Sequence, residues 1–216
     1  MKWLAGCAVL ASCFQLPDRH PIHDTSGDAH AGGDGAGGDG ITTDGKRNAN
    51  YVFMTSSTFT LTHTGAQATD DANAFCQQAA FQSITTSPVR GHYYKAWMSA
   101  DPVNVGDVLR ASQARAWIRT DGAPVAATVE DLTDGSILTT INLDENGDAA
   151  GNGQVMTGTA SSGYSDVGAD ANCTQGHVEI GDPTKTDARW TEDGYQPCTT
   201  MTLLLYCFGY DVIGEL

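Results

Sequence analysis

Met201-Thr-Leu-Leu-Leu-Tyr-Cys-Phe208 carries apolar side chains at both odd and even positions. A β-strand points alternate side chains to opposite faces, so this composition is typical of a strand that is covered on both sides. Each face of such a strand must be packed against another layer of secondary structure. The stretch therefore predicts a central strand within a layered domain.

The preceding sequence offers a helix to cover one face of that strand. Thr69 can cap a helix, and the acidic Asp70 and Asp71 favour its positive N-terminal end. Apolar residues then recur at helical spacing, at Ala72, Phe75, Cys76, Ala79 and Ala80. This pattern places Cys76 on the buried face of the predicted helix.

The remaining pattern predicts an α+β domain over residues 51–216. Strands are expected at 51–55, 93–99, 116–119, 125–129, 137–143 and 154–159, and a second helix is expected at 103–111. Between 160 and 197 the chain is rich in Gly, Asp, Ser, Asn and Thr, which predicts a long loop. The expected architecture is thus two helices with small antiparallel sheets and a long loop region.

Four of the six cysteines lie in this domain, at Cys76, Cys173, Cys198 and Cys207. They form neither a CxxC pair nor a Cys/His cluster with zinc spacing, so they predict two disulfides in an oxidising compartment. Four cysteines allow three pairings, and spacing alone does not decide among them. The order of the elements favours Cys76 with Cys207, and Cys173 with Cys198 at the base of the long loop.

The N-terminal residues have the pattern of an export signal. Lys2 precedes an apolar or small stretch from Trp3 to Cys13, which is too short to span a bilayer. Leu10-Ala-Ser-Cys13 resembles the lipobox of bacterial lipoproteins, which implies acylation of Cys13 and a membrane anchor in the cell envelope. Leu4-Ala-Gly-Cys7 also fits that pattern but leaves a very short signal, and cleavage without lipidation is the other alternative. We therefore assign residues 1–13 to a lipoprotein signal with its attachment site.

Residues 14–50 are expected to form a flexible linker between anchor and domain. From Pro17 to Asn50 the sequence holds eight Gly and six Asp, and its only large aliphatic residues are Ile22 and Ile41. Such a segment cannot bury enough apolar surface to offset the entropy of ordering it.

Five short motifs occur in a recurring order along the domain. They are Tyr51-Val-Phe-Met-Thr-Ser-Ser-Thr-Phe-Thr60, Ala72-Asn-Ala-Phe-Cys76, Tyr94-Lys-Ala-Trp-Met-Ser99, Met156-Thr-Gly-Thr159 and Leu205-Tyr-Cys-Phe208. Together they resemble a bacterial surface-lipoprotein domain family of unknown function, related in fold to endostatin and the C-type-lectin-like domains. The resemblance covers nearly all of residues 51–208. It implies a C-type-lectin-like domain with adjacent termini and a disulfide from the helix to the last strand.

The resemblance does not extend to calcium-dependent sugar binding. Lectins of this fold that bind sugar through calcium use a Glu-Pro-Asn or Gln-Pro-Asp loop and a Trp-Asn-Asp strand. This chain has neither, and its nearest match is Trp190-Thr-Glu-Asp193. Asp144, Asn146 and Asp148 could supply oxygen ligands to calcium, but Asn146-Gly147 is also a strong turn signal, and we favour the turn.

Charge and motifs restrict the function classes. The net charge is −15, with 26 acidic residues against 11 basic ones, which argues against nucleic acid as a partner. The chain contains no GxSxG elbow, HExxH helix, P-loop or dinucleotide fingerprint, so we expect neither an enzyme nor a cofactor.

The long loop is the expected ligand-binding region. Trp190 is its candidate aromatic contact, with Glu192 and Asp193 as polar partners; alternatively, Trp190 packs at the base of the loop. The favoured hypothesis is a lipid-anchored, extracytoplasmic binding module that recognises a glycan or a surface protein. The alternative is a non-catalytic structural component of an envelope or coat.

Overall fold

The computed structural model describes residues 48–151, 153–166, 170–171, 173, 175–198, 202–214 and 216. The lipid-attachment site expected at Cys13, the alternative Cys7 and residues 14–47 of the expected linker lie outside these residues. The described residues form an α+β fold, as the sequence predicts.

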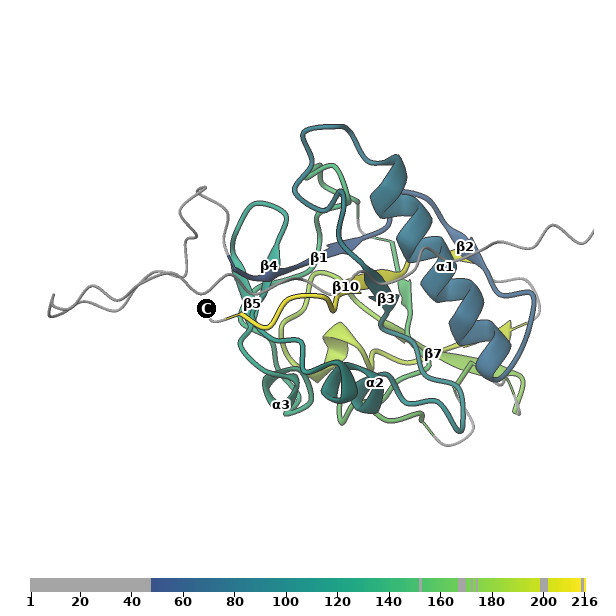
Figure 1. The fold of residues 1–216 in the computed structure, drawn as a ribbon. Coiled ribbons are helices and arrows are strands. Elements are labelled where there is room, and N and C mark those ends of the chain that lie inside the picture. The colour runs from purple at the N-terminus through teal and green to yellow at the C-terminus, as the bar shows by residue number, and fades with distance from the viewer. Residues whose placement is uncertain are drawn as a thin grey trace, which may run out of the picture. The chain divides into compact units, whose positions relative to one another are not determined.

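A five-stranded sheet in the order β3-β10-β1-β4-β5 forms the centre of the fold (Figure 1). Its strands are β1 (Asn50–Met54), β3 (Tyr94–Ala96), β4 (Trp117–Arg119), β5 (Pro124–Ala126) and β10 (Tyr206–Gly209). β10 pairs antiparallel with both β1 and β3, whereas β1 pairs parallel with β4. The expectation of small antiparallel sheets therefore does not hold for this central sheet, which is mixed. The connection from β1 to β4 includes two helices, and a crossover of this length allows two strands to run in the same direction.

Two smaller sheets accompany the central one. β2 (Phe59–Thr60) pairs with β9 (Thr202–Leu203), and β7 (His177–Gly181) lies between β6 (Val155–Met156) and β8 (Tyr195–Pro197). Both are antiparallel. The second of these sheets lies largely within the segment expected to be a loop, so that expectation is also wrong. Val178 and Ile180 of β7 are buried, and this alternation within a Gly- and Asp-rich segment is the signal that identifies the strand.

Helix α1 (Ala66–Gln82) covers one face of the central sheet. The helix begins at Ala66, four residues before Asp70, where a Thr69 cap would start it. Gly65 precedes it and adopts a positive φ of 63° that turns the chain into the helix. Thr69 instead lies within the helix, where its hydroxyl donates to the carbonyl of Ala66. The buried face is the expected one, and Cys76 lies on it.

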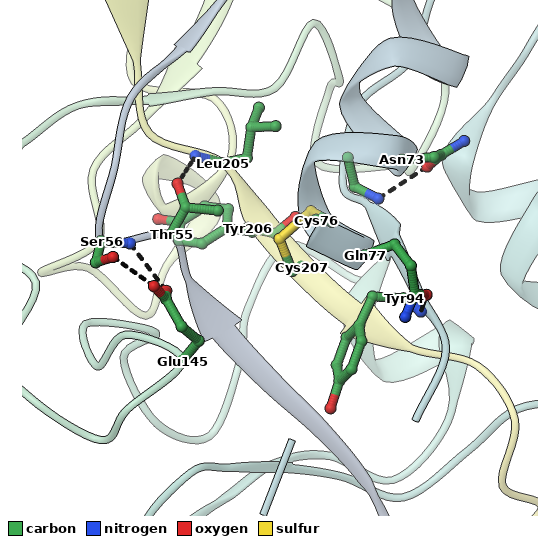
Figure 2. Close-up of a disulfide and its surroundings, with 11 residues drawn as sticks. Thr55, Ser56, Asn73, Cys76, Gln77, Tyr94, Glu145, Leu205, Tyr206 and Cys207 are labelled. Atoms are coloured by element: carbon green, nitrogen blue, oxygen red, sulfur yellow. Dashed lines mark hydrogen bonds between the residues drawn. A yellow bond between two sulfur atoms is a disulfide. The ribbon is translucent and has the colours of Figure 1, made fainter. Parts of the chain in front are cut away.

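Two amide side chains of α1 satisfy the outer edge of β3 (Figure 2). The Ala96 N–H donates to Oδ1 of Asn73 at 2.9 Å, and the Tyr94 N–H donates to Oε1 of Gln77 at 3.1 Å. Gln77 also donates from Nε2 to the carbonyl of His92. An exposed edge strand leaves such groups free to pair with another chain. The helix therefore closes this edge of the sheet.

Both disulfides have the pairing that the element order favours. Cys76 of α1 is bonded to Cys207 of β10 with a Cα–Cα distance of 5.5 Å (Figure 2). Cys173 is bonded to Cys198 with a Cα–Cα distance of 6.1 Å. Disulfides are typical of proteins in oxidising compartments, which indicates an extracytoplasmic location.

An aromatic cluster covers the other face of β10. Tyr206 and Phe208 pack with three tryptophans, and these five side chains are fully buried: Trp97, Trp117, Trp190, Tyr206 and Phe208. The ring centroids of Trp97 and Trp190 lie 4.8 Å apart, and those of Trp97 and Phe208 lie 5.3 Å apart. β10 is thus buried on both faces, as the sequence predicts for this strand. The single strand expected at 201–208 is wrong, however: of its described residues, 202–203 form β9 in a separate sheet and only 206–208 belong to β10.

Helices α2 (Val105–Ser112) and α3 (Val129–Leu132) pack on this second face. The strand expected at 125–129 ends at Ala126, because a capping box between Thr128 and Asp131 starts α3 there. The strand expected at 137–143 is not formed, although Ile137 and Ile141 are buried. No helix in the described part of the chain is both long and apolar enough to cross a membrane.

The two disulfides should differ in their effect on stability. They span 131 and 25 residues, so the chain-entropy model predicts losses of about 5 and about 3.5 kcal/mol in the free energy of unfolding. We expect the Cys76→Ala/Cys207→Ala double variant to be the less stable one, with Cys173→Ala/Cys198→Ala as its matched control, in urea unfolding. A greater loss in the control pair would contradict the central role of the α1–β10 link.

Candidate functional site

Trp190 is not available as a ligand contact. Its side chain is 0% exposed, and its ring lies 4.8 Å from that of Trp97 and 5.6 Å from that of Tyr206, centroid to centroid. It ends the short 3-10 helix η1 (Ala188–Trp190), whose start is capped by Asp187. The expected contact role is therefore corrected, and the alternative of packing beneath the loop is confirmed.

The backbone of Trp190 lies so close to Gly181 of β7 that a side chain cannot be placed there. A Cβ at Gly181 would overlap the backbone carbonyl of Trp190, so only glycine allows this approach. Thr191, the next residue, accepts a hydrogen bond from Nε1 of Trp97 at 2.7 Å and donates to the carbonyl of Thr159 at 3.0 Å. The segment before Glu192 is thus fixed to the core by both packing and hydrogen bonds.

Glu192 and Asp193 are exposed, as a ligand-binding role requires. Glu192 accepts the N–H of Ser161 through Oε2 at 2.9 Å, which joins it to the loop at 160–166. Asp193 instead lines a separate hollow of about 340 Å³ with Gln154, Asp182, Pro183 and Thr184. The two neighbouring acidic residues therefore belong to different parts of the surface.

The exposed aromatic residue of this region is Tyr195, which the sequence interpretation missed. Tyr195 is 59% exposed and lies directly opposite Glu179 in the β7–β8 pairing. Opposed residues of an antiparallel pair share one face of the sheet. The Tyr195 hydroxyl donates to Oδ2 of Asp166 at 3.2 Å. We call the group of Asp166, Glu179, Glu192 and Tyr195 the tyrosine–carboxylate face.

Glu179 is the buried member of this face. It is 0% exposed, and its Oε1 accepts the N–H of Gly194 at 3.0 Å. Burial raises the pKa of its carboxyl to about 8, and the charges of Asp166 and Glu192 add to this effect. A carboxyl with this pKa is mostly protonated at neutral pH. Its other oxygen, Oε2, has no hydrogen-bond partner among the described residues.

The charge of Asp166 affects Tyr195 in turn. The Asp166 carboxylate raises the pKa of the Tyr195 hydroxyl, which therefore stays protonated as a donor. The ring is consequently held by a hydrogen bond at its far end while its surface stays exposed. A second exposed tyrosine, Tyr164 at 46%, lies two residues before Asp166 in the chain. The face thus offers aromatic surface beside hydrogen-bond acceptors.

The Asp144 segment forms a turn. Oδ1 of Asp144 accepts the N–H groups of Asn146 and Asp148 at 2.8 and 2.9 Å, and the Gly147 N–H donates to the Asp144 carbonyl. Oδ1 of Asn146 accepts the N–H of Ile84. Oδ1 of Asp144 and Oδ1 of Asn146, which were candidate calcium ligands, are thus already occupied by backbone N–H groups. Within the described ranges, no group of three or more His, Cys, Asp or Glu residues is arranged to hold a metal ion.

Comparison with known proteins adds no assignment. No family model matches the chain, and no curated protein matches it. The function of the tyrosine–carboxylate face must therefore follow from its own geometry.

The raised pKa of Glu179 predicts a pH-dependent stability. An unperturbed glutamate has a pKa of 4.5, whereas that of Glu179 is about 8 in the folded protein. The folded state holds this proton more tightly, so the associated stability is present below pH 4.5 and is lost as the pH rises towards 8. Glu179→Gln has the shape of the protonated carboxyl but does not titrate. Thermal unfolding should show that the wild type loses stability relative to this variant across that window.

Glu192→Gln is a companion variant, because it removes one of the charges that raise the Glu179 pKa. It should lose less stability than the wild type over the same window. A difference between Glu179→Gln and wild type that stays constant with pH would show that Glu179 is already ionised in the neutral folded protein.

Proposed function

We propose that the domain is an extracytoplasmic binding module that recognises carbohydrate through the tyrosine–carboxylate face. The observation that carries this proposal is Tyr195, a residue that is 59% exposed while its hydroxyl donates a hydrogen bond to Asp166. An amphipathic ring of this kind can pack against the C–H surface of a sugar. Because the ring is already oriented, little side-chain entropy remains to be lost on binding.

The carboxylates supply the polar half of sugar recognition. The carboxyl oxygens of Asp166 and Glu192 can accept hydrogen bonds from sugar hydroxyl groups, and Glu192 is already positioned by the Ser161 N–H. Protonated Glu179 lies beneath them and limits the negative charge of the group. A hydroxyl-rich ligand suits this surface better than an apolar protein surface, because charged residues are depleted at the centres of protein interfaces.

The proposed resemblance to C-type-lectin-like and endostatin-like domains supports the same function. A domain of that kind would be a rigid scaffold that carries its ligand-binding residues on and beside its loops. Fold analogy does not fix a ligand, so the proposal depends on the site itself. The absence of the calcium-lectin motifs means that sugar binding here would use side chains directly.

A glycan array with the full chain tests this proposal. We expect Tyr195→Ala to weaken binding by at least about tenfold in Kd, because truncating a central aromatic contact removes much of the binding energy. Tyr93→Ala is the matched control, since Tyr93 is 60% exposed but lies outside the face. Failure of the wild type to bind any glycan would reject the function and favour a structural role in the envelope or coat. Equal losses in both variants would reject the assigned face.

The proposed location is the cell envelope, with a lipid on Cys13 as the anchor. The lipobox-like Leu10-Ala-Ser-Cys13 supports it, as do the two disulfides, which indicate an oxidising compartment. Cys13→Ala should abolish acylation and release the protein from the membrane fraction, as measured by fractionation and mass spectrometry. Cys7→Ala serves as the control, and release by that variant alone would assign the lipid to Cys7.

A further inference from the structure

A second hollow, of opposite charge, lies between the end of α2 and the start of α3. Its volume is about 430 Å³, within the range of small-ligand sites, and it is lined by Arg110, Gln113, Ala114, Arg115, Thr128, Val129 and Glu130. Two guanidinium groups thus border one pocket in a chain whose net charge is −15. We call it the arginine pocket.

Arg115 stands apart from the other basic side chains. It is exposed, and its guanidinium has no carboxylate, carbonyl or aromatic partner within the part of the chain that the structure describes. The other described basic side chains all have a carboxylate or an aromatic ring beside them: Arg90, Lys95, Arg110, Arg119, Lys185 and Arg189. In so acidic a protein, an arginine that stays unpaired beside a pocket is available to an external anion.

The backbone around Arg115 is held in an unusual conformation. Gln113 and Ala116 both have positive φ angles, of 59° and 60°, which non-glycine residues rarely adopt. Such conformations persist where the surroundings enforce them, and they cluster at functional sites. Here the Arg115 carbonyl accepts Nδ2 of Asn50 at 2.7 Å, and Arg115 forms a parallel bridge with Ile213. The side chain therefore projects from a fixed point.

Arg110 also lines the pocket, and its hydrogen bonds to neighbouring side chains are long. Its nitrogen atoms lie 3.3 Å from Glu130, 3.4 Å from Asp107 and 3.2 Å from Thr133. Charge-assisted hydrogen bonds of full strength are shorter, at about 2.7–2.9 Å. A ligand anion can therefore compete for this guanidinium, while Glu130 repels it from the rim.

We infer that the arginine pocket binds the carboxylate of a ligand about the size of one sugar or amino acid, with Arg115 as its principal donor. The planar guanidinium matches a carboxylate with two parallel hydrogen bonds. Arg110 adds a second positive charge, and the pocket volume accommodates the rest of the ligand. This site does not depend on carbohydrate binding at the tyrosine–carboxylate face, whose charge has the opposite sign.

Calorimetric titration of the full chain with D-glucuronate tests the inference, and D-glucose is the matched ligand because it has the same ring without the carboxylate. We expect glucuronate to bind and added salt to weaken it, while glucose does not bind this pocket. Arg115→Ala should lower glucuronate affinity by about tenfold or more. Arg189→Ala is the control, since Arg189 is also exposed but pairs with Asp187, and it should leave the affinity unchanged.

Glu130→Gln gives a test of opposite sign. Removing this rim charge should raise glucuronate affinity about threefold, since the carboxylate no longer competes for Arg110. Absence of glucuronate binding, or binding that Arg115→Ala leaves intact, would overturn the inference. Tighter binding of inorganic phosphate than of glucuronate would overturn the assignment to a carboxylate. Tyr195→Ala should leave glucuronate affinity in the arginine pocket unchanged, which separates this site from the proposed glycan face.

Discussion

The position of β10 inside the central sheet is the constraint on which the rest of the structure depends. This strand pairs with β1 on one side and β3 on the other, and it is buried on both faces. Cys207 bonds it to α1, whereas Tyr206 and Phe208 face the tryptophan cluster. One short strand therefore connects two separate hydrophobic clusters. Its alternating side chains determine which elements pack on which face.

The tryptophan cluster also fixes the chain segment that leads to the proposed binding face. Trp190 is buried against Trp97 and Tyr206, and Thr191 is hydrogen-bonded to Trp97 and to the Thr159 carbonyl. The chain then reaches Glu192 and Tyr195 from a fixed starting point. The proposed glycan face is consequently displayed by the core, even though it lies in a segment with the composition of a loop.

The distribution of charge gives the two surface sites different chemistry. At Glu179, burial raises the pKa of the carboxyl to about 8, and the neighbouring charges of Asp166 and Glu192 add to this effect. At the arginine pocket, Arg115 has no carboxylate partner among the residues that the structure describes. A protein with a net charge of −15 can thus present both a hydrogen-bonding acidic surface and a local cationic pocket.

The sequence by itself determined the features that depend on local periodicity. Helical spacing placed Cys76 on a buried face, and apolar side chains at both odd and even positions marked the last strand as covered on both sides. Element order then favoured the correct cysteine pairing. The tertiary structure alone decided the inward direction of Trp190, the parallel pairing of β1 with β4 and the burial of Glu179. It also brought Tyr195 to Asp166, and Glu130 to the pocket that Arg110 and Arg115 line. Periodicity encodes which side of an element is apolar, but which surfaces meet depends on packing between residues that are distant in the chain.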